Sequence, residues 1–160
     1  MELSLSSLSS LSFLGGRATY LSDLKAETYR FTPYLAREWP LRTDRSVLGG
    51  PLRLRGVDYA KGIGMHSRSE ATYRLDGRYR RFQATIGIDD ETNGKGSVIF
   101  EVLVDGKSAY KSPVLNGTSP AVSLPIVNVA GARTLTLSVD FATLADIQDH
   151  ADWCQALLVN

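Results

Sequence analysis

Apolar residues recur at every second position in several stretches of the chain. In the clearest case, 81–88, Phe82, Ala84, Ile86 and Ile88 alternate with polar residues or glycine. This spacing places one set of side chains on one face of a β-strand. Similar runs cover 18–24, 52–56, 70–75, 98–104, 109–114, 121–129, 135–141 and 153–159. Because helical spacing is almost absent, the pattern predicts an all-β fold, an antiparallel β-sandwich.

Turn-forming residues separate these strands. Asp105-Gly106 is the strongest hairpin signal, because both residues tolerate the positive φ of a tight two-residue turn. Residues 1–16 are rich in Leu and Ser and end in two glycines, so we expect a linker or edge segment before a single domain at 17–160. Residues 25–48 hold two prolines and four aromatic residues, which is typical of a long loop pinned by aromatic side chains.

Composition and charge narrow the classes of function. The 160 residues suffice for one domain with its own core, and the formal net charge of +1 gives no strong attraction to nucleic acid or anionic membranes. Cys154 is the single cysteine, so neither an internal disulfide nor a cysteine-based zinc site can form. No apolar run is long enough to cross a membrane, and the N-terminus lacks the basic start of a secretory signal. We therefore expect no nucleic-acid partner and no membrane insertion.

The first candidate for chemistry is the stretch Gly62-Ile63-Gly64-Met65-His66. Paired glycines in an apolar run indicate a bulge, a turn or a close approach of another backbone segment. His66 either faces a ligand or is a buried structural histidine, and the sequence favours neither. No metalloprotease, nucleophile-elbow or phosphate-loop motif accompanies it, so we expect no enzymatic activity.

Two further stretches concentrate polar side chains. Asp149-His150-Ala151-Asp152-Trp153 combines carboxylates, an imidazole and an indole, a mixture that suits the hydroxyl groups and C–H face of a sugar. Alternatively, Trp153 fills the core and Asp152 satisfies buried backbone donors. The loop from Asp89 to Asn93 gathers oxygen ligands and is either a cation or ligand site or a solvated turn.

Several motifs in order carry a family resemblance. They lie at 20–24, 50–52, 59–67, 73–77, 82–90, 96–100, 104–107 and 149–153. Over residues 20 to about 159 the chain resembles the NPCBM family of carbohydrate-binding modules, which is related to carbohydrate-binding module family 51. The resemblance implies a galactose-binding-like β-sandwich, or jelly roll, and non-catalytic binding of galactose-containing glycans. It also implies a place in a longer multidomain chain, in an extracellular or cell-envelope setting.

Sandwiches of this kind often hold a structural calcium where an N-terminal loop meets the C-terminal strand. By this resemblance, calcium would be bound by Asp44 together with Asp149 or Asp152. No other cofactor is expected.

We therefore predict a carbohydrate-binding module. The residues expected to line or support its site are His66, Asp89, Asp90, His150, Asp152 and Trp153. The alternative is a protein–protein or surface-assembly module without sugar binding. It is motivated by the aromatic residues Tyr29, Phe31, Tyr34 and Trp39, since exposed Tyr and Trp often anchor interfaces. An enzyme using His66 and Asp152 is a minor third option.

Overall fold

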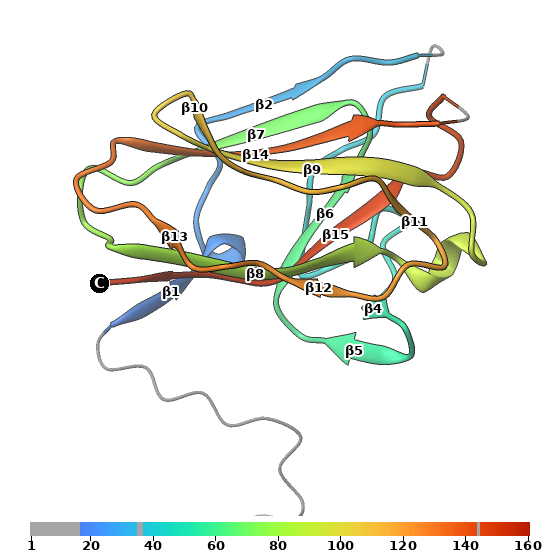
Figure 1. The fold of residues 1–160 in the computed structure, drawn as a ribbon, viewed down its shortest axis with the longest axis horizontal. Helices are drawn as coiled ribbons and strands as arrows, with labels where there is room; N and C mark the ends of the chain where they lie inside the picture. The colour runs from blue at the N-terminus through green and yellow to red at the C-terminus, as the bar shows by residue number, and fades with distance from the viewer. Residues whose placement is uncertain (1–16, 35–36, 144) are drawn as a thin grey trace, which may run out of the picture.

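The computed structural model describes residues 17–34, 37–143 and 145–160 (Figure 1). The predicted linker or edge segment at 1–16 lies outside these residues. Within the described part no helix is long and apolar enough to span a membrane. The only helical elements there are two short 3-10 turns, η2 (Leu21–Asp23) and η3 (Asp90–Thr92).

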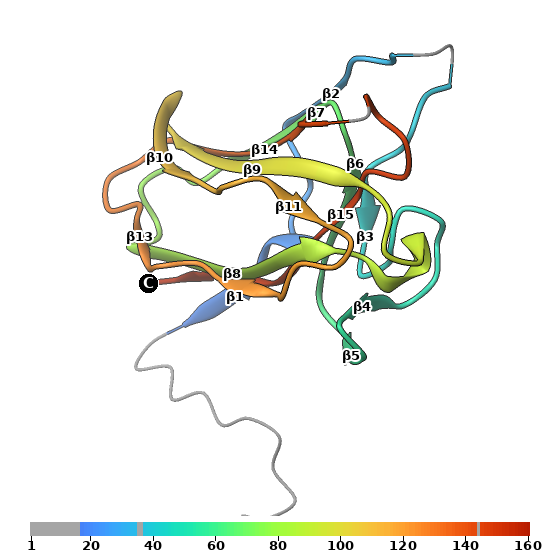
Figure 2. The ribbon, with the colours of Figure 1, turned by 45° about the vertical axis from the view of Figure 1, so that its right-hand side comes forward.

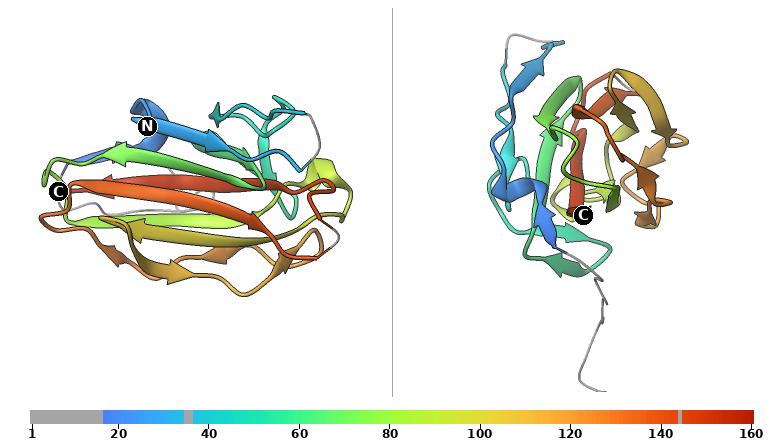
Figure 3. Two further views of the ribbon diagram at one scale, coloured as in Figure 1. Left: turned by 90° about the horizontal axis from the view of Figure 1, so that it is seen from above. Right: turned by 90° about the vertical axis from the view of Figure 1, so that its left-hand side faces the viewer.

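Two antiparallel sheets pack face to face, which confirms the predicted all-β sandwich (Figures 1 and 2). The seven-stranded sheet, sheet A, runs in the order β12 (Val122–Ser123), β8 (Arg81–Ile88), β15 (His150–Val159), β6 (Gly62–His66) and β3 (Arg42–Thr43), with β1 (Ala18–Tyr20) beside β15 and β13 (Val127–Asn128) beside β8. The six-stranded sheet, sheet B, runs in the order β10 (Lys107–Lys111), β9 (Ser97–Val104), β14 (Thr134–Phe141), β7 (Ser69–Arg74) and β2 (Thr28–Phe31), with β11 (Leu115–Asn116) beside β9. Figure 3 shows the layers from above and from one end.

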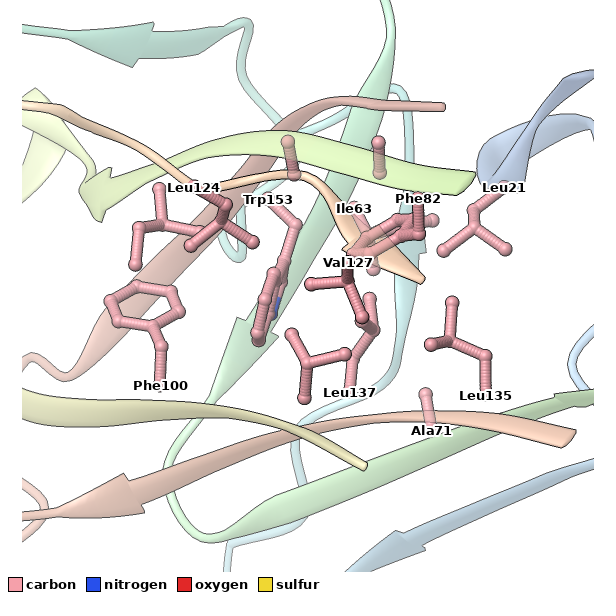
Figure 4. Close-up of a cluster of buried hydrophobic side chains, with 14 of the residues drawn as sticks. Leu21, Ile63, Ala71, Phe82, Phe100, Leu124, Val127, Leu135, Leu137 and Trp153 are labelled. Atoms are coloured by element: carbon pink, nitrogen blue, oxygen red, sulfur yellow. The ribbon is translucent and has the colours of Figure 1, made fainter. Parts of the chain in front are cut away.

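The core lies between the sheets and is built from the alternating apolar positions (Figure 4). Strand β8 contributes Phe82 and Ile86, and β14 contributes Leu135 and Leu137 from the opposite side. Trp153 of β15 is the largest fully buried side chain. Each such side chain stabilises the fold by about 1.5–3 kcal/mol through removal of apolar surface from water.

The sequence located some strands better than others. The range 81–88 is β8 as predicted, and Asp105-Gly106 forms the β9–β10 turn with φ values of 48° and 77°. Strands β2 and β3 lie inside the segment that we expected to be irregular. Strand β15 begins at His150 rather than at Trp153 and is buried on both faces. The sequence placed the start of this strand too late because the polar residues His150 and Asp152 resemble those of a loop.

A short hairpin covers the outer face of sheet A. It consists of β4 (Leu52–Leu54) and β5 (Val57–Tyr59), and its leucines pack on Cys154 of β15. The hairpin and the loop before it lie so close that a Cβ at Gly64 would collide with the Arg45 carbonyl oxygen. A Cβ at Gly87 would lie 3.0 Å from a methyl carbon of Leu54. The glycines of 62–66 therefore reflect a close approach of another segment, one of the alternatives left open by the sequence.

Candidate functional site

Two imidazoles meet on the outer face of sheet A, at the end where β15 begins. His150 pairs directly with His66 in the β15–β6 register. Their neighbours Met65 and Ala151 point into the core, so strand alternation turns both histidines to the outer face. The ring centroids are 5.4 Å apart. The sandwich thus brings together the only two histidines of the chain, which are far apart in sequence.

The loop that follows β2 adds an indole and a guanidinium. Trp39 stacks on His66 with ring centroids 4.8 Å apart and planes 4° from parallel. The Arg37 guanidinium carbon lies 3.9 Å from the centroid of the Trp39 ring. The imidazole and the guanidinium therefore both pack against the indole ring. This packing of Arg37 and His66 on Trp39 fixes the position of the indole beside the two histidines.

A hollow of about 390 Å³ opens beside these rings. Loops following β2 and β14, which lie at the same end of the sandwich in Figures 1 and 2, supply much of its wall. Leu48 and Ile147 are exposed in it and give it an apolar rim. The lining residues are Arg37, Trp39, Leu48, His66, Asp146, Ile147, Gln148 and His150.

Each imidazole is fixed through its Nδ1 atom. His66 Nδ1 lies 2.6 Å from the Ser67 carbonyl oxygen, and His150 Nδ1 lies 2.8 Å from Glu91 Oε1. Burial lowers the pKa of His66; the nearby His150 and Arg37 act in the same direction, while its bond to Ser67 opposes the shift. His66 is therefore neutral near pH 7.

Glu91 connects His150 to the rim of the hollow. Its Oε2 accepts a hydrogen bond from Ser46 Oγ (2.6 Å), and its Oε1 also accepts one from the Leu48 backbone N–H (3.2 Å). Burial raises the pKa of Glu91, but the donors from His150, Ser46 and Leu48 outweigh burial and hold that pKa below its usual value. Glu91 is thus an ionised acceptor at neutral pH.

Asp149 supports the site from below. Its buried carboxylate accepts hydrogen bonds from Ser67 Oγ (2.6 Å) and the Ser97 backbone N–H (2.8 Å). Burial nevertheless raises its pKa to about 6. Asp149 directly precedes His150, and Ser67 directly follows His66. The hydrogen bond between Asp149 and Ser67 therefore helps to hold the two histidines in register.

The remaining residues predicted for the sugar site lie elsewhere. Trp153 is fully buried and packs edge-on against Phe100. Asp89 accepts from the backbone N–H groups of Arg53 and Glu91. Asp90 accepts from Arg55 and Gly56 in the turn of the β4–β5 hairpin. Asp152 is fully buried under that hairpin, so none of these four side chains lines the hollow.

The three carboxylates expected to bind calcium belong to separate networks. Asp44 pairs with Lys61 at 2.7 Å, Asp149 is engaged by Ser67 and Ser97, and Asp152 lies under the hairpin. Within the described ranges, no group of three or more His, Cys, Asp or Glu side chains is arranged to hold a metal ion. This geometry does not support a shared site, and calcium binding stays a prediction.

Sequence reasoning missed Arg37, Trp39, Glu91 and Asp146 as site residues. The cluster of aromatic residues at 29–39 was the available signal for Trp39, and the acidic loop at 89–93 was the signal for Glu91. Neither signal shows that these loops meet beside the histidines. Their meeting depends on the pairing of β6 with β15, which brings His66 and His150 together.

A larger hollow of about 490 Å³ crosses the outer face of sheet B. Its charged side chains include opposite pairs across the strands, such as Arg68 with Asp140 and Lys111 with Glu101. The described residues that line it include no aromatic side chain. It is thus less suited to a sugar ring than the hollow beside the histidines.

Comparison with known proteins identifies similar sequences. The NPCBM/NEW2 domain profile matches residues 17–159. The chain is 39% identical over 108 residues to a candidate endo-alpha-N-acetylgalactosaminidase of Renibacterium salmoninarum, and 34% identical over 116 residues to alpha-1,3-galactosidase B of Akkermansia muciniphila. These alignments cover 68% and 70% of this chain but only 7% and 14% of the two relatives.

Solved structures show the same architecture. The second CBM51 module of Clostridium perfringens ZmpB, solved with the INT domains and GlcNAc, has a TM-score of 0.81 at 34% identity, over 90% of this chain and 32% of that one. The CBM51 of the Clostridium perfringens GH95 protein, in complex with methyl-galactose, has a TM-score of 0.80 at 28% identity, over 89% of this chain and all of that one.

Proposed function

Because this chain belongs to the NPCBM/NEW2 domain family, and is as such a carbohydrate-binding module, we propose that it binds a galactose-type sugar in the hollow beside His66 and His150. The observation that carries the proposal is the direct pairing of the two histidines at a hollow that also contains Trp39 and Arg37. Imidazole nitrogens and a guanidinium match the hydroxyl groups of a sugar, while Leu48 and Ile147 offer apolar contact to its C–H groups.

The sugar class rests on the relatives. One structural neighbour holds methyl-galactose, another holds GlcNAc, and one sequence relative is named as an alpha-1,3-galactosidase. We choose galactose because two of these three names point to it. The short span of the chain within both sequence relatives supports a targeting role in a larger, extracellular glycan-degrading protein.

The described lining of the hollow does not contain the pair of carboxyl groups that most glycosidases use. Glycosidases usually place two carboxyl groups on either side of the bond to be cleaved. Among the described residues that line the hollow, Asp146 is the one carboxylate. Glu91 is engaged by His150, Ser46 and Leu48. These contacts support binding without catalysis.

The protein–protein alternative receives less support. Tyr29, Phe31 and Trp39 are half-buried, and the Tyr29 hydroxyl donates to the Trp39 carbonyl oxygen at 2.8 Å. Tyr34 is the exposed aromatic residue of this loop. Three of the four aromatic residues therefore hold the loop in place, while the hollow beside His66 stays open.

Calorimetry with methyl galactoside, N-acetylgalactosamine and GlcNAc tests the proposal. We expect a Kd between about 1 μM and 1 mM for methyl galactoside, since few hydrogen bonds survive competition with water. His150→Ala should abolish measurable binding, whereas Glu70→Gln, on the exposed face of sheet B, should not change it. Absence of binding at millimolar concentrations of all three sugars would overturn the proposal.

A further inference from the structure

The hydrogen bonds around the two histidines determine what kind of ligand group they recognise. We propose that the Ser67 carbonyl and Glu91 hold both imidazoles in the Nδ1–H form. The hollow then presents two acceptor nitrogens, Nε2 of His66 and Nε2 of His150, to two neighbouring hydroxyl groups that act as donors. This inference rests on the proposed function and specifies its ligand as a sugar with two free, adjacent hydroxyl groups.

For His66 the argument follows from the partner atom. The Ser67 carbonyl oxygen can only accept a hydrogen bond, so the Nδ1 atom 2.6 Å away must carry the proton. In a neutral imidazole the other nitrogen, Nε2, is then an acceptor. Trp39 stacks on the ring and fixes its plane, so the direction of the Nε2 lone pair is set before a ligand arrives.

For His150 the same result follows from charge. Glu91 is ionised and acts only as an acceptor, so the Nδ1 atom of His150 donates to it at 2.8 Å. A carboxylate behind an imidazole fixes the tautomer and the ring orientation in this way at many functional sites. The geometry thus places one proton of His150 on Nδ1, and in the Nδ1–H tautomer Nε2 is the second acceptor.

Both histidines are almost fully buried, with exposed fractions of 2% for His66 and 5% for His150. Among the hydrogen bonds of the described residues, none involves Nε2 of His66 or of His150. Both rings line the hollow, with centroids 5.4 Å apart. Two acceptors on paired strands can therefore reach two hydroxyl groups of one sugar ring.

Glu91 acts as a positioning residue in this arrangement. One carboxylate holds His150 through Oε1, Ser46 through Oε2 and the Leu48 backbone at the rim of the hollow. It therefore sets both the tautomer of one acceptor and the position of the neighbouring wall. Its own side chain is not among those that line the hollow.

The tautomers can be measured in the free protein. We expect ¹⁵N NMR of the two imidazoles at pH 7.5 to show both protons on Nδ1. A proton on Nε2 of either ring would overturn the proposal, whatever the protein binds. Because this measurement needs no sugar, its result separates a failure of the proposal from a failure of the proposed function.

Modified sugars test the direction of the hydrogen bonds. A deoxyfluoro analogue of methyl galactoside lacks the hydroxyl donor at the substituted position but keeps an electronegative atom there. Replacing either of two adjacent hydroxyl groups should weaken binding by about 5- to 100-fold, since a desolvated acceptor loses its donor. If methyl galactoside binds and every fluoro analogue binds equally well, the proposal is overturned; if no sugar binds, the proposed function itself fails.

Glu91→Gln tests the positioning role, with Glu70→Gln as its matched control. Glutamine has nearly the same shape but is neutral, and its NH₂ group can donate to His150. We expect a mixed tautomer at His150, an unchanged tautomer at His66 and weaker binding of methyl galactoside by about fivefold or more. An unchanged His150 tautomer would contradict the role of Glu91. Should this variant fail to fold, the wild-type tautomers and the fluoro sugars still decide the proposal.

Discussion

Trp39 contributes to the site mainly by holding its neighbours. The indole packs against both the His66 ring and the Arg37 guanidinium, so its removal would release both. We predict that Trp39→Ala weakens binding of methyl galactoside tenfold or more, equivalent to about 1.4 kcal/mol. Tyr34→Ala is the matched control, since Tyr34 lies in the same loop, is exposed and packs on Phe141. Calorimetry on both variants would measure the difference, and equal losses would contradict a specific role for Trp39.

Asp152 gives the fold an unusual dependence on pH. Its carboxyl group is fully buried, and neither oxygen has a hydrogen-bond partner within the described residues. Burial raises the pKa of Asp152 well above its usual value, and the neighbouring Asp89 and Glu91 raise it further. The folded protein therefore holds this proton more tightly than the unfolded chain does. Stability due to Asp152 is greatest below pH about 4 and falls as the pH rises towards its folded pKa.

Asp152→Asn should remove this dependence. We expect the free energy of unfolding of the wild type to fall by up to about 1.4 kcal/mol per pH unit above pH about 4 because of Asp152. The asparagine variant should show a shallower slope and greater stability at pH 7, whereas Asp58→Asn, on the exposed side of the hairpin, should keep the wild-type slope. Urea unfolding at several pH values would measure both. Identical slopes in wild type and Asp152→Asn would contradict the prediction.

At the scale of single residues, the sequence identified the two histidines but not their surroundings. His66 and His150 stood out because they are the only histidines and adjoin glycines or carboxylates. Trp153 matched the expected chemistry equally well, yet strand alternation turns it into the core. Trp39 and Glu91 reach the site through loops whose course depends on the whole sandwich. Residue type alone therefore could not separate the buried tryptophan from the one at the site.

At the scale of elements, the contact between sheet A and the loop before β4 links stability to the site. Gly64 lies directly beneath Arg45 and Ser46, and Ser46 holds Glu91 through its hydroxyl group. A methyl group at Gly64 would have to displace backbone atoms of this loop. We predict that Gly64→Ala lowers the free energy of unfolding by about 1–3 kcal/mol and weakens sugar binding as well.

Gly50→Ala is the control for this prediction. Gly50 lies in the same loop, but a Cβ there would meet its nearest neighbour, Ser46 Oγ, at an ordinary 3.5 Å. We expect a change in stability of no more than about 0.5 kcal/mol. Thermal unfolding and calorimetry on both variants would test the pair. A Gly64→Ala variant as stable as Gly50→Ala would contradict the close approach described here.

The elements also show which parts of the fold a sequence can predict. Strand β8 faces the core on one side only over much of its length, so its alternation is visible and its range was predicted correctly. Strand β15 is covered by the core on one face and by the β4–β5 hairpin on the other. Burial on both faces removes the alternation, and the polar residues at 150 and 152 then resemble a loop. The β4–β5 hairpin that covers this face of β15 lies about 100 positions earlier in the sequence.

At the scale of the whole molecule, the site and the two ends of the domain lie far apart. Strand β15 begins at His150 in the site and ends at Val159, where it pairs with β1, and the Asn160 backbone N–H donates to the Arg17 carbonyl oxygen. Figure 1 shows β1 and the C-terminus together at one end of the sandwich. A ten-residue strand spans about 33 Å, which separates this end from the hollow. Polypeptide joined at either end would therefore be attached about one strand length away from the hollow.

This arrangement predicts how the module behaves when it is repeated. Two copies joined by a short flexible linker should bind a densely galactosylated surface about 10²- to 10⁴-fold more tightly than one copy, because the second contact forms at a high effective concentration. Towards soluble methyl galactoside, each copy should keep the Kd of the single domain. Surface plasmon resonance would measure the first quantity and calorimetry the second. A tandem in which one copy carries His150→Ala should return to single-domain affinity; if it keeps the full gain, the second contact does not involve the hollow.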